Sequence, residues 1–358
     1  MNVKMSLSRS AFTKVVSMAV VMVAIFPQYG EACSRVLWND NCKAVVVGRT
    51  LDWFVPNPAD LYVLPRGINR DGMTGENTLT WKAKYGTVMT YSQAVTDGMN
   101  EKGLAGHLLF LLETDFGEFD PESASLSVSL WLQYYLDNFA TVEEAVSFTR
   151  NTDFNIASAT LDGVKVGVHL SLEDPTGDSA VIEYLDGKPV IYHGKEYTVM
   201  TNSPTYDEQL KNRALYEGFG GEKPLPGTTK SPDRFVRASY YLKDLFEPET
   251  ARECVGGVLS VMRNVSQPFS GATSAPNPDE PNESTTRWLT IADLTNRVYY
   301  YSSTLAPNII WVKLDNLDFS EGTTIRKLDL VNQPDRIGDS TKQFETAKPF
   351  PVLPPDLD

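Results

Sequence analysis

Cys33 is the residue whose place in the chain gives it unusual chemistry. Residues 1–14 contain three bases and no acid, and residues 15–26 form an almost unbroken apolar run. Such a run, followed by a helix breaker and by small residues at positions 30 and 32, is typical of a secretory signal peptide. It is shorter than the ~20 apolar residues that span a bilayer. We therefore expect residues 1–32 to be cleaved on export, so that Cys33 becomes the first residue.

A cysteine at a new N-terminus carries a thiol and a free α-amine in one residue. An α-amine has a pKa near ~7.7–8.0 and a thiol near ~8.5, so the amine can accept the thiol proton at neutral pH. Cys33 would then supply both a nucleophile and its base. The alternative is lipidation of Cys33, which would use both groups to anchor the chain to a membrane. Gly30, where lipoprotein signals usually have Leu, and Glu31 before the small residue favour the free cysteine.

The composition restricts the class of protein and its partners. Cleavage before Cys33 leaves 326 of the 358 residues, enough for a large core. The formal charge of the full chain is −14, and loss of three bases and Glu31 brings it to about −16. A surface this acidic disfavours nucleic acids and anionic membranes as partners. No membrane contact is expected unless Cys33 is lipidated.

The sequence motifs of metal and cofactor sites are missing. There is no His-Glu-x-x-His, Cys-x-x-Cys, Walker loop or Gly-x-Ser-x-Gly elbow. The three histidines, His107, His169 and His193, fall in segments expected to be strands or hairpins. Cys254 lies in a helical pattern, and we expect Cys42 and Cys254 to be free thiols rather than a disulfide. The sequence therefore predicts no metal and no cofactor.

Strand patterns dominate the chain and are interrupted by two helical blocks. Strands are expected at 35–38, 43–48, 60–64, 79–85, 86–94, 103–112, 165–172, 179–185, 188–193, 196–201, 286–293, 297–302 and 309–313. Helices are expected at 126–139, from Thr141 to 151, from Ser231 onward and at 250–264, with Ser231 as a cap. Residues 97–102 are expected to form a turn. With no linker in view, we expect one α+β domain of stacked layers over 33–358.

Polar residues at predicted strand ends could support Cys33. Arg49 and Asp52 end a strand expected to form a hairpin with the strand of Cys33. Arg49 would lower the thiol pKa, and Asp52 would hold the ammonium form of the amine. The alternative is a surface ion pair. Asn202 follows a strand and could donate its amide to an oxyanion, or simply form a turn. Arg234, in the first turn of a helix, requires an acidic partner or solvent.

Five segments in chain order resemble the choloylglycine hydrolase family, which contains the penicillin V acylases and conjugated bile salt hydrolases. They are Cys33 after the signal, Gly48-Arg49-Thr50-Leu51-Asp52-Trp53, Asp97-Gly98-Met99-Asn100-Glu101-Lys102-Gly103-Leu104, Thr201-Asn202-Ser203-Pro204-Thr205-Tyr206 and Ser231-Pro232-Asp233-Arg234-Phe235-Val236-Arg237. The similarity extends from Cys33 to about Lys313.

This resemblance implies an N-terminal-nucleophile hydrolase fold, a four-layer αββα sandwich that cleaves linear amides. Cys33 would be the nucleophile, and Arg49, Asp52, Asn202 and Arg234 would be the supporting catalytic residues. The family tends to form tetramers, so a homotetramer is expected.

One position departs from the family pattern. Bile salt hydrolases usually carry an Asn in a Leu-Asn-Phe-Pro-Gly segment, where this chain has Leu109-Phe110-Leu111. The change favours the exported subgroup of Gram-negative bacteria, which would place the protein in the periplasm. Phenoxyacetyl amides, bile salts and N-acyl homoserine lactones are all expected as substrates of that subgroup. Trp53 and Phe110 are assigned to substrate binding, with a purely structural role for Phe110 as the alternative.

The sequence therefore predicts an exported, cofactor-free amidase acting on a small-molecule amide. The alternative from another class is a lipid-anchored periplasmic binding protein with Cys33 as its lipidation site.

Overall fold

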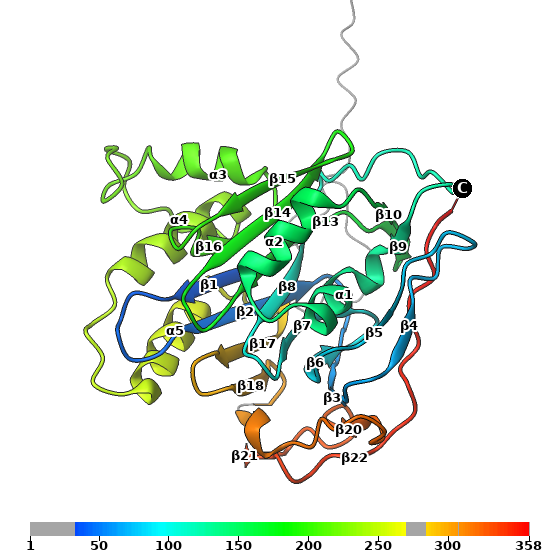
Figure 1. The fold of residues 1–358 in the computed structure, drawn as a ribbon. Coiled ribbons are helices and arrows are strands. Elements are labelled where there is room, and N and C mark those ends of the chain that lie inside the picture. The colour runs from blue at the N-terminus through cyan, green and yellow to red at the C-terminus, as the bar shows by residue number, and fades with distance from the viewer. Residues whose placement is uncertain (1–32, 270–283, 307, 358) are drawn as a thin grey trace, which may run out of the picture.

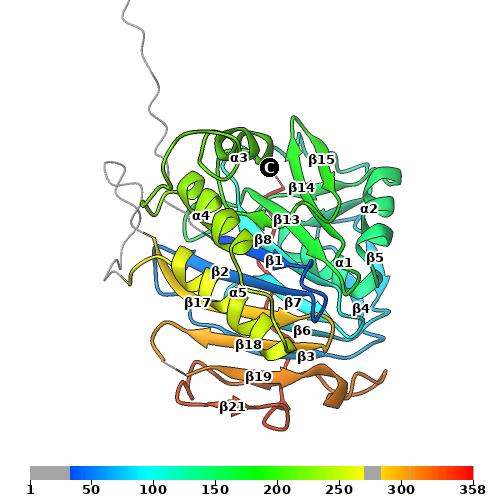
Figure 2. The same cartoon turned by 90° about the vertical axis from the view of Figure 1, so that its left-hand side faces the viewer.

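The computed structural model describes residues 33–269, 284–306 and 308–357. The expected signal peptide, residues 1–32, lies outside these described residues. Two large β-sheets face each other, and helices cover both outer faces (Figure 1, Figure 2). This arrangement is the expected four-layer αββα sandwich, and it confirms the predicted α+β class.

The first sheet, called the β1 sheet, has seven strands within the described ranges. In spatial order they are β16 (Val199–Met200), β1 (Ser34–Trp38), β2 (Val46–Trp53), β17 (Thr285–Asp293), β18 (Val298–Ser303), β19 (Ile310–Lys313) and β21 (Gly338–Asp339). All neighbours are antiparallel except β19 and β21. The first residues of the described chain thus lie in the interior of this sheet.

The second sheet, called the β8 sheet, has nine strands among the described residues. Their order is β15 (Lys188–His193), β14 (Ser179–Leu185), β13 (Val168–Glu173), β8 (Ala105–Phe110), β7 (Val95–Asn100), β6 (Thr87–Tyr91), β3 (Asp60–Leu64), β20 (Arg326–Leu328) and β22 (Glu345–Thr346). Asp186 and Gly187 join β14 to β15 with φ angles of 51° and 72°, as the predicted hairpin turn requires.

Short strand pairs and helices complete the fold. The pairs are β4 (Asn69–Asp71) with β5 (Thr80–Lys82), β9 (Ser125–Ser127) with β10 (Asn155–Ala157), and β11 (Thr160–Leu161) with β12 (Val164–Lys165). The helices are η1 (Val128–Leu130), α1 (Trp131–Asn138), α2 (Val142–Asn151), α3 (Tyr206–Arg213), α4 (Ser231–Lys243), α5 (Ala251–Val265) and η2 (Leu314–Asn316). No helix in the described ranges is both long and apolar enough to cross a membrane.

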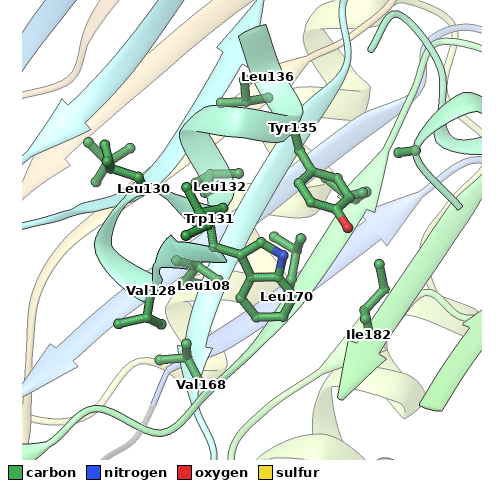
Figure 3. Packing of buried hydrophobic residues seen from close by; sticks show 14 of the residues in the cluster. Leu108, Val128, Leu130, Trp131, Leu132, Tyr135, Leu136, Val168, Leu170 and Ile182 are labelled. Carbon is green, nitrogen blue, oxygen red and sulfur yellow. The ribbon is translucent and has the colours of Figure 1, made fainter. Parts of the chain in front are cut away.

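Three apolar layers hold these elements together. The first lies between the two sheets and includes Val47 of β2, Met99 of β7 and Trp288 of β17. The second joins α1 and α2 to the outer face of the β8 sheet, and Figure 3 shows Trp131 of α1 packed beside Leu170 of β13 within it. The third joins α4 and α5 to the β1 sheet. Central strands such as β2 and β8 are therefore buried on both faces.

Helix α5 lies directly on the hairpin that positions the first residues. Thr250 begins the helix with a capping box shared with Glu253, which satisfies the free N–H groups of its first turn. Gly48 of β2 permits the close approach, because a Cβ there would lie 2.6 Å from Met262 and 2.8 Å from Val258. A side chain at position 48 would therefore push the helix off the sheet.

Several local predictions need correction. Residues 97–100 belong to strand β7 rather than to a turn, which is confined to the residues after Asn100. Helix α3 was not predicted, although Asp207 and Glu208 in its first turn and bases in its last turn follow the usual helix pattern. Ser231 is the first residue of α4, not its cap, which is Lys230.

Candidate active site

Cys33 lies immediately before β1 and is buried, with 5% of its surface exposed. Its backbone nitrogen donates a hydrogen bond to Asn202 Oδ1 at 2.5 Å. Its Sγ lies 3.9 Å from the backbone oxygen of Asp52. The next residue, Ser34, donates its backbone N–H to Thr50 Oγ1 at 3.1 Å. The beginning of the strand is therefore held on both sides by side chains from other parts of the chain.

Arg49 approaches the thiol from the neighbouring strand. Because side chains alternate along β2, Arg49 shares the face of Val47 and Leu51, which is directed between the sheets. Its Nη2 lies 3.8 Å from Cys33 Sγ and donates to the backbone oxygen of Leu108 at 3.1 Å. The guanidinium also lies 4.7 Å from the ring centroid of Trp288. Its Nε and Nη1 are buried and have no hydrogen-bond partner among the described residues.

Asp52 is fully buried beside the same hairpin. Its Oδ1 accepts a hydrogen bond from Thr286 Oγ1 at 2.6 Å, and its Oδ2 lies 3.5 Å from Thr50 Oγ1. A β-bulge after Thr286 in β17 sets the register that places this hydroxyl opposite Asp52. The structure thus brings Asp52 to the site, where its recorded hydrogen bonds run to threonine hydroxyls. The two threonines were not predicted as site residues.

Asn202 connects the nucleophile to the facing sheet. Besides accepting from Cys33, it donates from Nδ2 to the backbone oxygen of Phe110 at 2.7 Å. This pattern of partners fixes which side-chain atom is oxygen and which is nitrogen. The backbone N–H of Asn202 donates to Ser231 Oγ at 2.9 Å, and its backbone oxygen accepts from Gln209 Nε2 at 2.9 Å. Ser231 therefore supports the Asn202 loop instead of capping α4, and Gln209 of the unpredicted helix α3 does the same.

Arg234 is fully buried, and the groups that accept its hydrogen bonds are neutral, while the carboxylate of Asp52 favours its charge from nearby. Its Nη1 donates to the backbone oxygen of Cys33 and to Ser34 Oγ, both at 2.6 Å. Its Nη2 donates to Asn202 Oδ1 at 3.0 Å. Burial lowers the pKa of Arg234 to about 10, against the opposing effect of the negative charge of Asp52. Arg234 therefore fixes the main chain of Cys33 and the side chain that holds its nitrogen.

Burial dominates the acid–base behaviour of the site. It raises the pKa of the Cys33 thiol above its ordinary value, and the nearby positive charge of Arg49 only partly offsets this. It also raises the pKa of Asp52 to about 6, against the lowering effect of Arg234. The expected lowering by Arg49 is present, but the net shift of the thiol has the opposite sign. The resting thiol is therefore protonated and needs a base when it reacts.

A largely apolar cavity of about 80 Å³ opens beside Cys33 Sγ. Arg49 and Asp52 lie at its wall next to the thiol, and Trp53 and Phe110 line it as well. Trp53 Nε1 donates to Asp162 Oδ2 at 2.9 Å, which fixes the indole against the turn between β11 and β12. Phe110 also belongs to the apolar core between the sheets. Phe110 is therefore both a core residue and a wall of the cavity, and its role in substrate binding stays a prediction.

A buried charged network behind the site was missed in the sequence. Arg35 Nη2 of β1 lies 2.5 Å from Glu173 Oε2, and Glu173 Oε1 lies 2.5 Å from His107 Nε2 at an angle poor for a hydrogen bond. His107 Nδ1 lies 2.7 Å from Asp97 Oδ2, and Asp97 accepts from Tyr299 of the facing sheet. These charges explain why residues 97–100 form a strand despite their polar composition: protein groups replace water around Asp97.

The other cysteines and histidines lie where the sequence placed them. Cys33, Cys42 and Cys254 are free thiols, and Cys254 is buried in α5. His107, His169 and His193 lie on β8, β13 and β15. Within the described ranges, no group of three or more His, Cys, Asp or Glu side chains is arranged to hold a metal ion.

A buried cysteine at the start of a central strand of an αββα sandwich is the arrangement of a cysteine N-terminal-nucleophile hydrolase. Sequence comparison identifies the family within this class of hydrolases. Residues 33–329 match the family described as linear amide C–N hydrolases, choloylglycine hydrolase family. The chain belongs to this family and is a hydrolase of linear amides.

The most informative relatives are penicillin V acylases. One from Pectobacterium atrosepticum is 37% identical over 364 residues, covering 94% of this chain and 96% of the relative. A solved penicillin V acylase from Agrobacterium tumefaciens is 42% identical with a TM-score of 0.80, covering 90% of this chain and 99% of that one. A mutant conjugated bile acid hydrolase from Clostridium perfringens is 21% identical with a TM-score of 0.67, covering 83% and 96%. The last similarity shows the shared fold alone.

Proposed function

We propose that this protein is an exported amidase that uses Cys33 as an N-terminal nucleophile and acts on phenoxyacetyl amides. The observation that carries the proposal is the environment of Cys33. Its thiol borders an apolar cavity, while Asn202 and Arg234 hold its main-chain nitrogen and oxygen. The nitrogen becomes a free α-amine when residues 1–32 are removed. The family match, which begins at residue 33, supports that cleavage point.

The reaction begins with a proton transfer within Cys33. Because burial raises the pKa of the thiol, the α-amine takes the thiol proton as sulfur attacks the amide carbonyl. The C–N bond then breaks, and the leaving amine takes that proton from the ammonium. Water attacks the resulting thioester with the amine as base again. The products are the acyl acid and the free thiol.

Hydrogen-bond donors around the thiol would stabilise the oxyanion formed at each step. Arg49 Nε and Nη1 have no partner among the described residues, and Arg49 lines the cavity. Asn202 uses one N–H of its amide for Phe110, which leaves the second for the substrate. In a buried site, preorganised hydrogen-bond donors stabilise an oxyanion more than they would in water. Asp52 lines the same cavity, accepts hydrogen bonds from Thr50 and Thr286, and balances the charge of Arg234.

Phenoxyacetyl amides are favoured over the other two substrate classes. The relatives at 37% and 42% identity, which cover most of this chain, are penicillin V acylases. The bile acid hydrolase is only 21% identical, and Phe110 stands where bile salt hydrolases usually carry an Asn. The apolar lining of the cavity favours an apolar acyl group, such as an aromatic one, because burial of apolar surface is favourable. Bile salts and N-acyl homoserine lactones serve as competing substrates in the test.

Export to the periplasm and a free N-terminus are parts of the same proposal. The alternative is a lipid-anchored binding protein. It is disfavoured because a lipid on the thiol of Cys33 would have to occupy the buried cavity, where only 5% of the residue is exposed. The homotetramer stays a prediction, which light scattering of the purified protein tests.

Two measurements test the proposal. The intact mass of protein recovered from the periplasm should equal that of residues 33–358, and a diacylglycerol addition would support the binding protein instead. The protein should release amine from phenoxyacetyl amides, and Cys33→Ala should abolish this release without changing the fold. Cys33→Ser should be nearly as inactive, because a hydroxyl is far less acidic than a thiol. Cys254→Ala is the control that retains activity; amine release that survives Cys33→Ala refutes the mechanism.

A further inference from the structure

The last segment of the described chain forms part of the wall of the cavity beside Cys33. Residues 347–357, called the C-terminal strap, leave the β8 sheet after β22 and run toward β9 and β10, as the red end of the ribbon in Figure 1 shows. Leu353 of the strap lines the cavity together with Arg49 and Phe110. A segment more than 300 residues from the nucleophile in the sequence therefore borders the space beside it.

The strap is fixed on either side of Leu353. Before it, the ring of Phe350 stacks on Tyr91 at a centroid distance of 4.5 Å and packs edge-on against Tyr62 at 5.2 Å. After it, Pro355 forms an isolated β-bridge with Ala159. The backbone N–H of Asp356 also donates to the backbone oxygen of Ser158 at 2.8 Å. These contacts fix the place of Leu353 along the cavity.

One hydrogen bond ties Leu353 itself to the opposite wall. Ser129 of η1 donates from Oγ to the backbone oxygen of Leu353 at 2.8 Å, and Ser129 lines the same cavity. The side chain of Leu353 is half-buried and packs against the apolar core under α1. Prolines at 349, 351, 354 and 355 restrict the backbone on both sides. The position of this side chain is therefore well defined, although no regular strand contains it.

The cavity is small, so the wall formed by Leu353 affects which acyl groups fit into it. Its volume of about 80 Å³ is well below the ~150 Å³ of an engineered protein cavity that admits benzene. An aromatic or long acyl group therefore requires one wall to yield. The walls from β2 and β8 belong to regular antiparallel ladders, and moving them would break many hydrogen bonds. At Leu353, the tie to the facing wall is a single hydroxyl hydrogen bond.

We propose that the C-terminal strap sets the acyl-group preference of this enzyme and that Leu353 is its specificity-determining residue. The inference rests on the proposed function, because it concerns the cavity wall that limits the size of the acyl group of the amide substrate. The family match ends at residue 329, so the strap lies outside the segment that defines the shared chemistry. Its sequence can therefore vary the substrate without altering the residues around Cys33.

Substitutions of opposite size at Leu353 test the inference. Leu353→Ala enlarges the cavity and should raise the ratio of kcat/KM for decanoyl to that for butyryl amides of one amine by about tenfold or more, the discrimination that a few buried methylenes provide. Leu353→Trp should lower the same ratio. The matched control is Leu357→Ala, because Leu357 belongs to the strap, is exposed and does not line this cavity. Thermal unfolding of each variant verifies the fold.

Opposite shifts for the two Leu353 variants, with no shift for Leu357→Ala, support the inference. Ratios that equal the wild-type value in both folded Leu353 variants overturn it. A second arm measures the binding of decanoic and butyric acids by calorimetry in Cys33→Ala protein, with and without the Leu353 substitutions. If wild-type protein hydrolyses no amide, the proposed function fails, and the binding ratios alone then support or overturn the role of the strap.

Discussion

Replacing Asn202 by Asp and by Ala should shift the pH profile of the enzyme in opposite directions. Asn202 Oδ1 accepts from the nitrogen of Cys33 at 2.5 Å and from Arg234 Nη2 at 3.0 Å. Asp would put a negative oxygen at this place and stabilise the ammonium form of Cys33. Ala would remove the acceptor and leave the amine facing the cation of Arg234. The two changes therefore act on the α-amine with opposite signs.

The contacts of Asn202 Oδ1 determine how far each substitution should shift the pKa of the α-amine. A charge of opposite sign within ~4–6 Å typically moves a pKa by about 1–3 units. Because Arg234 shares the same oxygen, we expect the lower end, a rise of about one unit in the pKa of the amine in Asn202→Asp. Rates at pH values below that pKa would fall about tenfold beyond any loss on the plateau. In Asn202→Ala, the maximal kcat/KM on the plateau of the pH profile should fall by about 10²–10³, because a donor to the oxyanion is lost.

The assay is kcat/KM for a phenoxyacetyl amide from pH 5 to 9, which reports the ionisations of the free enzyme. The acid limb should move to higher pH in Asn202→Asp and to lower pH in Asn202→Ala. Asp52 is the competing group, because burial raises its pKa to about 6. Asp52→Asn is the control that distinguishes the α-amine of Cys33 from this carboxyl. It removes the acid limb of the pH profile only if that limb reports the ionisation of Asp52.

Coinciding acid limbs in wild type, Asn202→Asp and Asn202→Ala would refute the assignment of the amine as the base. A limb that disappears in Asp52→Asn would instead transfer the role to Asp52.

Two further perturbations probe the N-terminus and the buried charges. An extra Met-Ala before Cys33, verified by mass spectrometry, should reduce turnover by about 10²–10⁴, because an amide cannot accept the proton; full activity would contradict the mechanism. Burial alone would lower the pKa of His107, but Asp97 and Glu173 raise it to about 9. Its contribution of about 3 kcal/mol to the free energy of unfolding is present below pH ~6.5 and lost as pH rises through 9. Urea unfolding should show this loss in wild type and not in His107→Gln.

The elements that carry Cys33, Arg49 and Asp52 could be predicted because local signals determine them. The strand from 35 to 38, a turn of Asn and Asp, and a second apolar strand give the β1–β2 hairpin, which places Arg49 opposite Arg35. The capping pattern at Thr141 likewise predicts α2. In each case the residues that fix the element are neighbours in the sequence.

The partners of these side chains could not be predicted, because they come from distant segments. Thr286 reaches Asp52 only through the bulged pairing of β17 with β2. Arg234 was expected to need an acid or water, yet the main-chain oxygen of Cys33 and Asn202 Oδ1 accept its hydrogen bonds. Leu353 lies in a segment that looked only polar and proline-rich. Nothing in its local pattern indicates a cavity wall.

The proposed cleavage would put Cys33 at the end of the chain, where long-range contacts must hold it in place. Chain termini are usually poorly ordered unless they are tied down, whereas attack on a carbonyl requires sulfur at a defined distance and angle. In this fold, Asn202 holds the nitrogen of Cys33, Arg234 holds its oxygen, and Thr50 holds the next N–H. These three side chains come from a loop, a helix and the paired strand. Since each tether fixes main-chain atoms, the place of the thiol is decided by a single side-chain torsion, and Asp52 and Arg49 contact it there.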